Sequence, residues 1–321
     1  MARILTGIQS SGVPHLGNIL GAILPAIELS KKNESFLFIA DLHALTTIKD
    51  KATLRNNTLA TAAAWLAFGL DTKKNALYRQ SDIMQVTELM WYLNCITPYP
   101  MLANAHSFKD KANKLSDVNA GLFTYPVLMA ADIILYNANI VPVGKDQLQH
   151  LEITRDIANR FNFLFGETFI IPKAKTDDGS MIIPGTDGKK MSKSYDNCIN
   201  ILGPEKILKK QIMNIVTDSR SLDEPKDPTM CNVFQIYKLI ASESDVTKLE
   251  HRYKNGGLGY GHAKKELFEL ILEIFKEPRK KFNLLIENPD EIERELLEGS
   301  EKASKVADSV MRKVKTKLGL N

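Results

Sequence analysis

Short apolar runs that alternate with helical stretches are the feature that most constrains the fold of this chain of 321 residues. Ser35–Ala40 reads SFLFIA, a continuously apolar run with the length of a strand that is buried on both faces. Strands are also predicted over Arg3–Ile8, Ala76–Arg79 and Ile140–Val143. The stretches between them predict helices over Asn18–Lys31, Ala52–Leu70, Val86–Cys95, Gly121–Tyr136 and Asp146–Phe161. Because strands that alternate with helices form parallel sheets covered on both faces, the first half predicts an α/β domain.

The second half of the chain has a different pattern. Between Lys175 and Tyr195 the sequence becomes polar and rich in Gly, Asp, Lys and Ser, which is typical of a loop. Beyond this loop, helices are predicted over Pro204–Thr217, Asn232–Ser242, Lys264–Phe275 and Glu301–Leu318. We therefore expect an α/β domain over residues 1–195 and a helical domain over residues 196–300. The last helix, at about 301–318, is free to pack back on the first domain.

Charge and cysteine content exclude several classes of protein. The net charge of +4 is mildly basic, so a polyanionic partner is permitted but not required. Cys95, Cys198 and Cys231 lie far apart with no CxxC pair, which argues against a disulfide framework and against a zinc or iron–sulfur site. No apolar run is long enough to span a membrane, and the N-terminus lacks the layout of a signal peptide. We expect a cytoplasmic protein without a membrane or a resident metal.

A glycine-containing turn follows the first predicted strand and reads GIQSSGVPHLGN over Gly7–Asn18. Such a turn between strand and helix lets the backbone approach a phosphate group. Gly7 and Gly12 have the spacing of a Walker loop, but Val-Pro stands where that motif needs Lys and Ser or Thr, and GxGxxG is absent. The remaining candidate is HLGN at His15–Asn18, which is similar to the HIGH motif of nucleotidyltransferases. By itself it is equally consistent with a turn and a helix cap.

A second motif, KMSKS, occupies Lys190–Ser194. Two ammonium groups on a loop flanked by Gly185 and Gly188 suit the charge that develops on a leaving pyrophosphate, and the flanking glycines would let the loop close. The alternative is a solvated basic loop. Both motifs occur in the order, and on the elements, that class I aminoacyl-tRNA synthetases use, which favours a role in binding phosphates.

An apolar helix with a single carboxylate follows in the sequence, YPVLMAADIILY over Tyr125–Tyr136. Tyr125, Met129 and Asp132 are spaced i, i+4 and i+7, so they share one face of this helix. A buried carboxylate is costly unless it is hydrogen-bonded. Asp132 is therefore expected either to cap neighbouring backbone or to accept a hydrogen bond from a ligand.

The next segment, IVPVGKDQLQH over Ile140–His150, leads from a strand through Gly144 into a helix. This arrangement directs Asp146 and Gln147 toward the carboxyl edge of the sheet, where ligands of parallel sheets bind. His150 is expected to be structural or to be the partner of a site residue.

The chain closely resembles the tryptophanyl-tRNA synthetases of class I in the runs that contain Pro126–Leu135 and Val141–Asn162. The likeness continues in the segments VTDS, CNVF and EKA, and so covers nearly the whole chain. It implies a Rossmann-like catalytic domain with a parallel sheet, a helical anticodon-binding domain at residues 196–300, and a homodimer. Tyrosyl-tRNA synthetases share the fold and a similar Gly-x-Asp-Gln turn, but not the LMAAD helix in this form.

The resemblance also implies roles for individual residues. Asp132 would accept the indole N–H of tryptophan, and the amino acid would further contact Met129, His43, Val143, Tyr125, Gln147 and Gln9. ATP would contact Gln9, Ser10, Ser11, Gly17, Asn18, Gly144, Lys145, Asp146, Ile183, Lys190, Met191, Ser192, Lys193 and Ser194. The residues implied to act on the phosphates, by positioning and charge, are His15, Lys111, Lys190 and Lys193. Mg²⁺ would be held by ATP rather than by a protein site.

The activity implied is that of a tryptophan–tRNA ligase. The enzyme would activate L-tryptophan with ATP to tryptophanyl-adenylate and pyrophosphate, and would then transfer tryptophan to tRNA(Trp). Two alternatives stand beside it: a tyrosyl-tRNA synthetase and a non-catalytic RNA-binding paralogue. The presence of His15, Lys190, Lys193 and Asp132 argues against the second alternative, because a chain without catalytic constraint would be expected to lose some of them.

Overall fold

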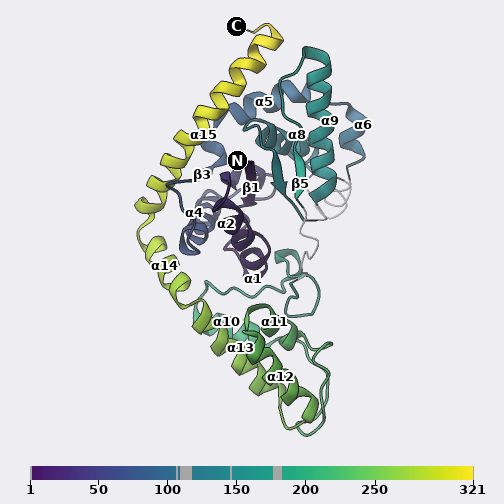
Figure 1. Cartoon of the computed structure of the whole chain (residues 1–321), viewed down its shortest axis with the longest axis vertical. Coiled ribbons are helices and arrows are strands. Elements are labelled where there is room, and N and C mark those ends of the chain that lie inside the picture. The colour runs from purple at the N-terminus through teal and green to yellow at the C-terminus, as the bar shows by residue number, and fades with distance from the viewer. Residues whose placement is uncertain (1, 106–107, 109–117, 145–146, 176–182, 321) are drawn as a thin grey trace. The chain divides into compact units, whose positions relative to one another are not determined.

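A five-stranded sheet in which every strand is parallel to its neighbours is the central layer of the α/β part of the chain (Figure 1). The computed structural model describes residues 2–105, 108, 118–144, 147–175 and 183–320. The order of strands across the sheet is β3-β2-β1-β4-β5. Their bounds are β1 Arg3–Gln9, β2 Glu34–Ala40, β3 Ala76–Arg79, β4 Ile140–Pro142 and β5 Lys173–Lys175. The α/β class and the four strands predicted from apolar runs are thereby confirmed.

The chain divides into two compact units. Unit 1 comprises Met1–Gly12, Ala26–Ser180 and Asn288–Asn321, and unit 2 comprises Val13–Pro25 and Met181–Glu287. This division differs from a single boundary near residue 195, because the segment after β1 and the segment with the KMSKS motif both belong to unit 2. The two motifs that the sequence singled out for phosphate binding therefore lie in one unit.

Helices surround the sheet in unit 1. Those that begin and end in this unit are α3 Asp41–Ala44, α4 Lys51–Ala67, η2 Gln80–Asp82, α5 Met84–Asn94, α6 Tyr99–Ala103, α8 Ala120–Ile134, α9 Leu148–Phe165 and α15 Pro289–Leu318. The core is continuous from the sheet through α5, α8 and α9 to α15, with Val127, Leu151 and Val310 among its buried side chains. The segment β2 is buried along all but its first residue, as its unbroken apolar sequence predicts.

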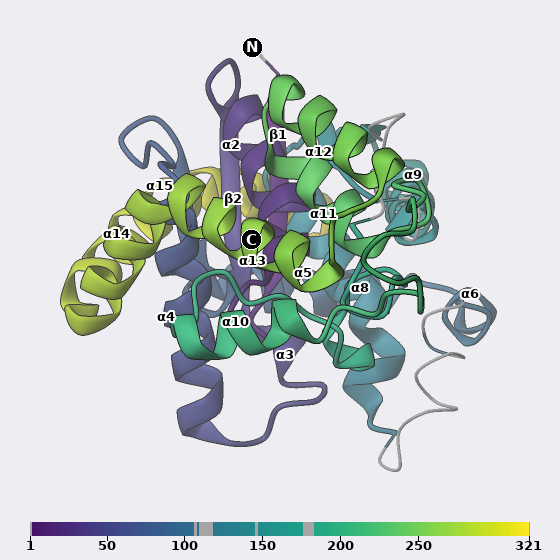
Figure 2. The ribbon, with the colours of Figure 1, turned by 90° about the horizontal axis from the view of Figure 1, so that it is seen from below.

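Unit 2 is built mainly of helices. They are α1 Leu16–Asn18, the π-helix η1 Ile19–Ile23, η4 Lys193–Tyr195, α10 Glu205–Met213, α11 Asn232–Ile240, α12 Glu243–Asn255, α13 Tyr260–Ile274 and α14 Lys276–Glu287. Helix α2, Leu24–Ser30, spans the boundary between the units. In unit 2, α13 packs against α10, α11 and α14, and α11 also contacts α12 (Figures 1 and 2).

Several elements differ from the sequence-based expectation, and the helices α3, α6 and α14 were not predicted. The short strand β5 reads KAK and is exposed, so no apolar run marks it. Helix α12 buries only Leu249 and Tyr253, so its polar sequence hides the helical period. The helix predicted over Glu301–Leu318 begins much earlier, at Pro289. Proline at the first turn of a helix lacks only an N–H that would have no partner there, so Pro289 is a suitable start.

Helix α15 packs directly against β3 (Figure 1). Its buried face carries small residues one turn apart, Gly299, Ala303 and Ala307, which let the helix backbone come close to the strand. A Cβ placed on Gly299 would lie 1.8 Å from the carbonyl oxygen of Leu77. Only glycine fits this position.

In the described part of the chain, no helix is both long and apolar enough to cross a membrane.

Replacing Gly299 with alanine is expected to destabilise the protein by about 3 kcal/mol, because the added methyl group forces α15 away from the backbone of β3. Urea unfolding at equilibrium measures the loss. The matched control is Gly261→Ala in α13, where an added Cβ meets nothing within 4 Å. That variant should stay within about 1 kcal/mol of the parent protein. Equal stability of the two variants would contradict the packing described for Gly299.

Candidate active site

The carboxyl ends of β1 and β4 meet at the point where the strand order reverses. From β1, the chain proceeds to β2 and β3 on one side and later to β4 and β5 on the other. In open α/β sheets, this switch point is where ligands bind. Gln9 is the last residue of β1, Ser10 and Ser11 follow it, and Val143 and Gly144 follow β4. Five residues predicted to bind ATP or tryptophan therefore lie at the switch point.

The side chains of Ser10 and Gln9 differ in their hydrogen bonding. The side chain of Ser10 is completely buried, and its hydroxyl has no hydrogen-bond partner among the described residues. The Gln9 side-chain amide donates to the carbonyl oxygen of His43 at 3.2 Å. Gly144 is exposed, and its carbonyl accepts from the backbone N–H of Gln147 at 2.9 Å. A buried hydroxyl without a partner is costly, which makes Ser10 a reasonable contact for a ligand.

Asp132 is buried on α8, with only 2% of its surface exposed. Two side chains from other elements bind its carboxylate. The His43 Nε2 atom, on α3, lies 2.9 Å from Oδ2. The Gln80 amide, on η2, donates to Oδ1 at 2.9 Å and to Oδ2 at 2.8 Å. Asp132 therefore does not cap neighbouring backbone, and side chains satisfy it instead. Gln80 was not predicted from the sequence, because glutamine after a short strand is an ordinary surface pattern.

Burial raises the pKa of Asp132, because removal from water disfavours the charged form. The hydrogen bonds from His43 and Gln80 and the charge interaction with His43 act in the opposite direction and stabilise the carboxylate. The nearby Asp41 carboxylate adds to the increase. The charge state of Asp132 thus depends on the donors that surround it.

Tyr125 is positioned by two aromatic neighbours. Its hydroxyl is hydrogen-bonded to Nε2 of His150 on α9, and the rings of His43 and Tyr125 meet edge to face at a centroid distance of 6.1 Å. His150 is thus the hydrogen-bond partner of Tyr125, a predicted site residue. Met129 and Val143 are half-buried and pack against the core cluster, while Gln147 is the residue before the first turn of α9.

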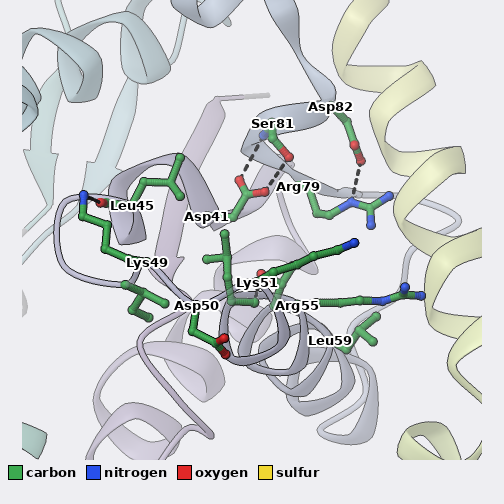
Figure 3. A pocket seen from close by; sticks show the side chains of 13 residues that line it. Asp41, Leu45, Lys49, Asp50, Lys51, Arg55, Leu59, Arg79, Ser81 and Asp82 are labelled. Atoms are coloured by element: carbon green, nitrogen blue, oxygen red, sulfur yellow. Dashed lines mark hydrogen bonds and ion pairs between the residues drawn. The ribbon is translucent and has the colours of Figure 1, made fainter.

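A cavity of about 630 Å³ lies beside the connections that follow β2 and β3 (Figure 3). Asp41, which follows β2, accepts hydrogen bonds from both the backbone N–H and the hydroxyl of Ser81. Arg79 points to Asp82, 3.0 Å away. None of the residues predicted for tryptophan or ATP lines this cavity. The hydrogen bonds between Ser81 and Asp41 in its wall connect the turn that contains His43 to the turn that contains Gln80.

In unit 2, His15 caps the short helix α1. Its Nδ1 atom accepts the backbone N–H of Asn18 at 3.3 Å, and the Asn18 side chain accepts the backbone N–H of His15 at 3.2 Å. The ring is buried, and a Cβ on Gly17 would lie 2.9 Å from it, so glycine is needed there. The HLGN sequence therefore does form a helix cap, and of the two ring nitrogens of His15 only Nε2 is left for the predicted contact with phosphates.

The two motifs are in contact although they are far apart in the sequence. The backbone N–H of Gly17 points to Sδ of Met191 at 3.3 Å, and Leu16 donates to the carbonyl of Ile199 at 2.9 Å. Met191 is buried and donates to the carbonyl of Ile183 at 2.8 Å. The fold of unit 2 thus brings His15 and the KMSKS segment together.

Asn197 organises the KMSKS segment and was missed in the sequence. It is buried, accepts the backbone N–H of Ser192 at 2.8 Å, and donates to the carbonyl of Lys190 at 3.1 Å. A Cβ on Gly185 would lie 2.4 Å from Asn197, and Gly188 adopts a positive φ of 82° beside Asn232. Gly185 is thus packed closely against Asn197, and Gly188 has a backbone conformation that favours glycine. Closure of the loop stays a prediction. The hydroxyls of Ser192 and Ser194 lie 2.9 Å apart.

Burial lowers the pKa values of both His15 and Lys193. Burial, together with the Lys193 ammonium, lowers the pKa of His15 to about 4. His15 is therefore neutral at pH 7, and because Nδ1 accepts a hydrogen bond, the proton lies on Nε2. The ring therefore offers a neutral N–H donor at this pH. Although Lys193 is exposed as a residue, the protein around its ammonium lowers its pKa to about 8.

Three predicted site residues, Lys111, Lys145 and Asp146, lie outside the described residues. Lys190 and Ser194 are exposed. Within the described ranges, no group of three or more His, Cys, Asp or Glu side chains could hold a metal ion.

Comparison with known proteins identifies the family. The model of the class I tRNA synthetases for tryptophan and tyrosine (W and Y) matches residues 1–276. The chain is 49% identical to a tryptophan–tRNA ligase of Campylobacter jejuni, over 99% of this chain and 100% of that protein. It is also 49% identical to the tryptophan–tRNA ligase of Rhodopirellula baltica, with 99% of each chain covered.

Solved structures agree with these sequence matches. The tryptophanyl-tRNA synthetase of C. jejuni in complex with ADP and tryptophan superimposes with a TM-score of 0.95 at 49% identity. The match covers 99% of this chain and 100% of that one. By sequence motif, by fold and by the contact between its two signature segments, this chain belongs to the class I tRNA synthetase family of the tryptophan and tyrosine enzymes.

Proposed function

We propose that this protein is a tryptophan–tRNA ligase. It activates L-tryptophan with ATP to form tryptophanyl-adenylate and pyrophosphate, and then transfers tryptophan to tRNA(Trp). The observation that carries the proposal is the buried Asp132 carboxylate on an apolar helix, held by Gln80 and His43. An ionised acceptor in apolar surroundings selects a ligand that combines a large apolar ring with one N–H donor, which describes the indole ring.

Unit 1 would bind the amino acid. Asp132 accepts the indole N–H, and Met129, Val143 and His43 contact the ring. Tyr125 and Gln147 hold the α-ammonium group, and Gln9 lies near the carboxylate. A site with a buried hydrogen-bond acceptor rejects ligands that lack an N–H donor, because such ligands leave the acceptor without a hydrogen bond. Ser10, Ser11, Gly144 and Ile183 would contribute to ATP binding, together with Gly17 and Asn18.

The chemical step needs no covalent enzyme intermediate. The carboxylate of tryptophan, which is already ionised, attacks the α-phosphate in line, and pyrophosphate leaves. Lys190 and Lys193 stabilise the charge on the departing group, and the Nε2–H of His15 donates a neutral hydrogen bond. The terminal ribose hydroxyl of tRNA then attacks the carbonyl of the adenylate, and AMP leaves. Mg²⁺, bound mainly by the ATP phosphates, would supply further charge neutralisation.

The helices of unit 2 beyond the KMSKS segment would bind the anticodon region of tRNA. Lys206, Lys209 and Lys210 on α10 are exposed and are suited to phosphate contacts, which position RNA without reading its sequence. On α15, in contrast, Lys302 donates to backbone carbonyls at Thr72 and Lys73, and Lys315 pairs with Glu88 at 2.7 Å. Those two lysines support packing on unit 1 rather than an RNA contact. A homodimer and a cytoplasmic location remain predictions from the family.

The test of the proposed function is pyrophosphate exchange into ATP with each of the twenty amino acids. Tryptophan alone should support rapid exchange. Exchange with tyrosine instead would indicate a tyrosyl-tRNA synthetase, and no exchange with any amino acid would indicate a non-catalytic paralogue. Aminoacylation of tRNA(Trp) then tests the second step.

Replacing Asp132 with asparagine should lower kcat/KM for tryptophan by a factor that corresponds to about 2–3 kcal/mol, because a charge-assisted hydrogen bond in a dry pocket is lost. Exchange kinetics at varied tryptophan concentration measure the effect, and circular dichroism checks the fold. The control is Asp308→Asn on the exposed surface of α15, which should change kcat/KM little. An Asp132 variant within about twofold of the parent would remove this residue from the tryptophan site.

Replacing Lys193 with alanine should slow adenylate formation while leaving the affinity for tryptophan nearly unchanged, because the ammonium acts on charge that appears in the transition state. Rapid-quench measurements separate the two quantities. A loss confined to tryptophan affinity would contradict this role and would indicate that the KMSKS segment is a solvated basic loop.

The pH dependence provides an independent check on Lys193. Its charge is present below, and lost above, a pKa of about 8, so kcat/KM for exchange should fall as pH rises through that value. The variant Lys193→Arg keeps its charge at every pH in the assay. It should therefore lose this alkaline limb even if its rate is lower. Identical alkaline limbs in the two proteins would assign the titration to another group.

A further inference from the structure

We propose that Gln80 is the positioning residue that keeps Asp132 an oriented, ionised hydrogen-bond acceptor, and that it thereby sets the preference for substrates with an indole N–H. The inference rests on the proposed function, because it concerns the same tryptophan site. Gln80 is completely buried, and its side-chain amide reaches both carboxylate oxygens of Asp132.

The orientation of the Gln80 amide is fixed by the protein. Its carbonyl oxygen accepts the backbone N–H of His43 at 3.3 Å. A flipped amide would place that oxygen against the carboxylate of Asp132 and would point the NH₂ group at another N–H, so both interactions would become repulsive. The NH₂ group is therefore held toward Asp132, and the carboxylate always meets a donor on this side.

The backbone that carries Gln80 is also anchored. The residue that follows it, Ser81, donates to Asp41 through its backbone N–H at 3.0 Å and through its hydroxyl. Asp41 belongs to the same short helix as His43, α3. The two turns that supply the donors of Asp132 are thus tied to each other, and neither can move away independently of the other.

The number of acceptor positions on Asp132 leaves room for a ligand. A carboxylate offers about four lone-pair positions. In the described part of the chain, Gln80 occupies one on each oxygen and His43 occupies a second on Oδ2. One position remains on Oδ1. Because Gln80 and His43 fix the orientation of the carboxylate, an N–H can approach this remaining position from one direction.

The chemistry of glutamine suits this task better than that of a cation. Burial raises the pKa of Asp132, so the carboxylate needs donors in order to remain ionised. Lysine or arginine would supply donors but would also neutralise the charge. The amide stabilises the anion and leaves its negative charge available to the N–H of a substrate.

The experiment compares tryptophan with its analogue in which sulfur replaces the indole N–H, using pyrophosphate exchange with the full-length protein. Two substitutions remove the NH₂ donors. Gln80→Met keeps a similar length and volume, and Gln80→Leu removes the donors with a shorter apolar side chain. In each variant, the ratio of kcat/KM for tryptophan to kcat/KM for the analogue should fall by about tenfold, mainly through the KM for tryptophan.

The control is Gln85→Met on α5, where the glutamine amide also donates to a carboxylate, that of Asp308. This variant should keep the parent ratio. A Gln80 variant that folds and discriminates as well as the parent protein would overturn the proposal, because a space-filling role alone predicts an unchanged ratio. If Gln80→Met does not fold, Gln80→Leu decides by the same ratio. Failure of the proposed function is seen separately, as absence of tryptophan-dependent exchange in the parent protein.

Discussion

In a parallel sheet every strand ends at the same edge, and the candidate tryptophan site depends on this constraint. The residues that follow β1, β2, β3 and β4 are neighbours for this reason alone, although they come from distant parts of the sequence. Gln9 is the last residue of β1, and His43 and Gln80 stand three and one residues beyond β2 and β3. Hydrogen bonds then connect them, from Gln9 to His43 and from His43 and Gln80 to Asp132. The sheet supplies proximity, and the side chains supply orientation.

The second constraint is the cost of burying a charge. An ionised carboxylate in an apolar interior is tolerated only when donors surround it. Asp132 meets this condition with two side chains, and the same donors that stabilise it also limit where a ligand can bind. His15 illustrates the opposite solution. Its burial beside Lys193 makes the ring neutral, so the protein gains a fixed N–H donor rather than a second cation next to a lysine.

The sequence predicted the parts of the structure that carry a strong local pattern. SFLFIA identified β2, and the helical period in YPVLMAADIILY placed Tyr125, Met129 and Asp132 on one face. KMSKS identified a segment that the fold does bring to His15. Elements without such a pattern were missed, including the three-residue strand β5 and the polar helix α12. Gln80 and Asn197 were missed for another reason. Each acts through tertiary hydrogen bonds, which depend on the positions of distant segments and leave no signal in the local sequence.

The packing of α15 on β3 has a consequence for how the protein reaches its folded state. Strand β3 is at the edge of the sheet, and an open edge can pair with strands of other chains. The helix that covers it, α15, comes much later in the sequence than β3. During synthesis, β3 therefore leaves the ribosome long before its cover does, and the edge stays open until α15 has emerged. The contact between Leu77 and Gly299 is also highly non-local, and such contacts form slowly. A nascent chain of this protein is vulnerable to aggregation in the interval between the emergence of β3 and that of α15.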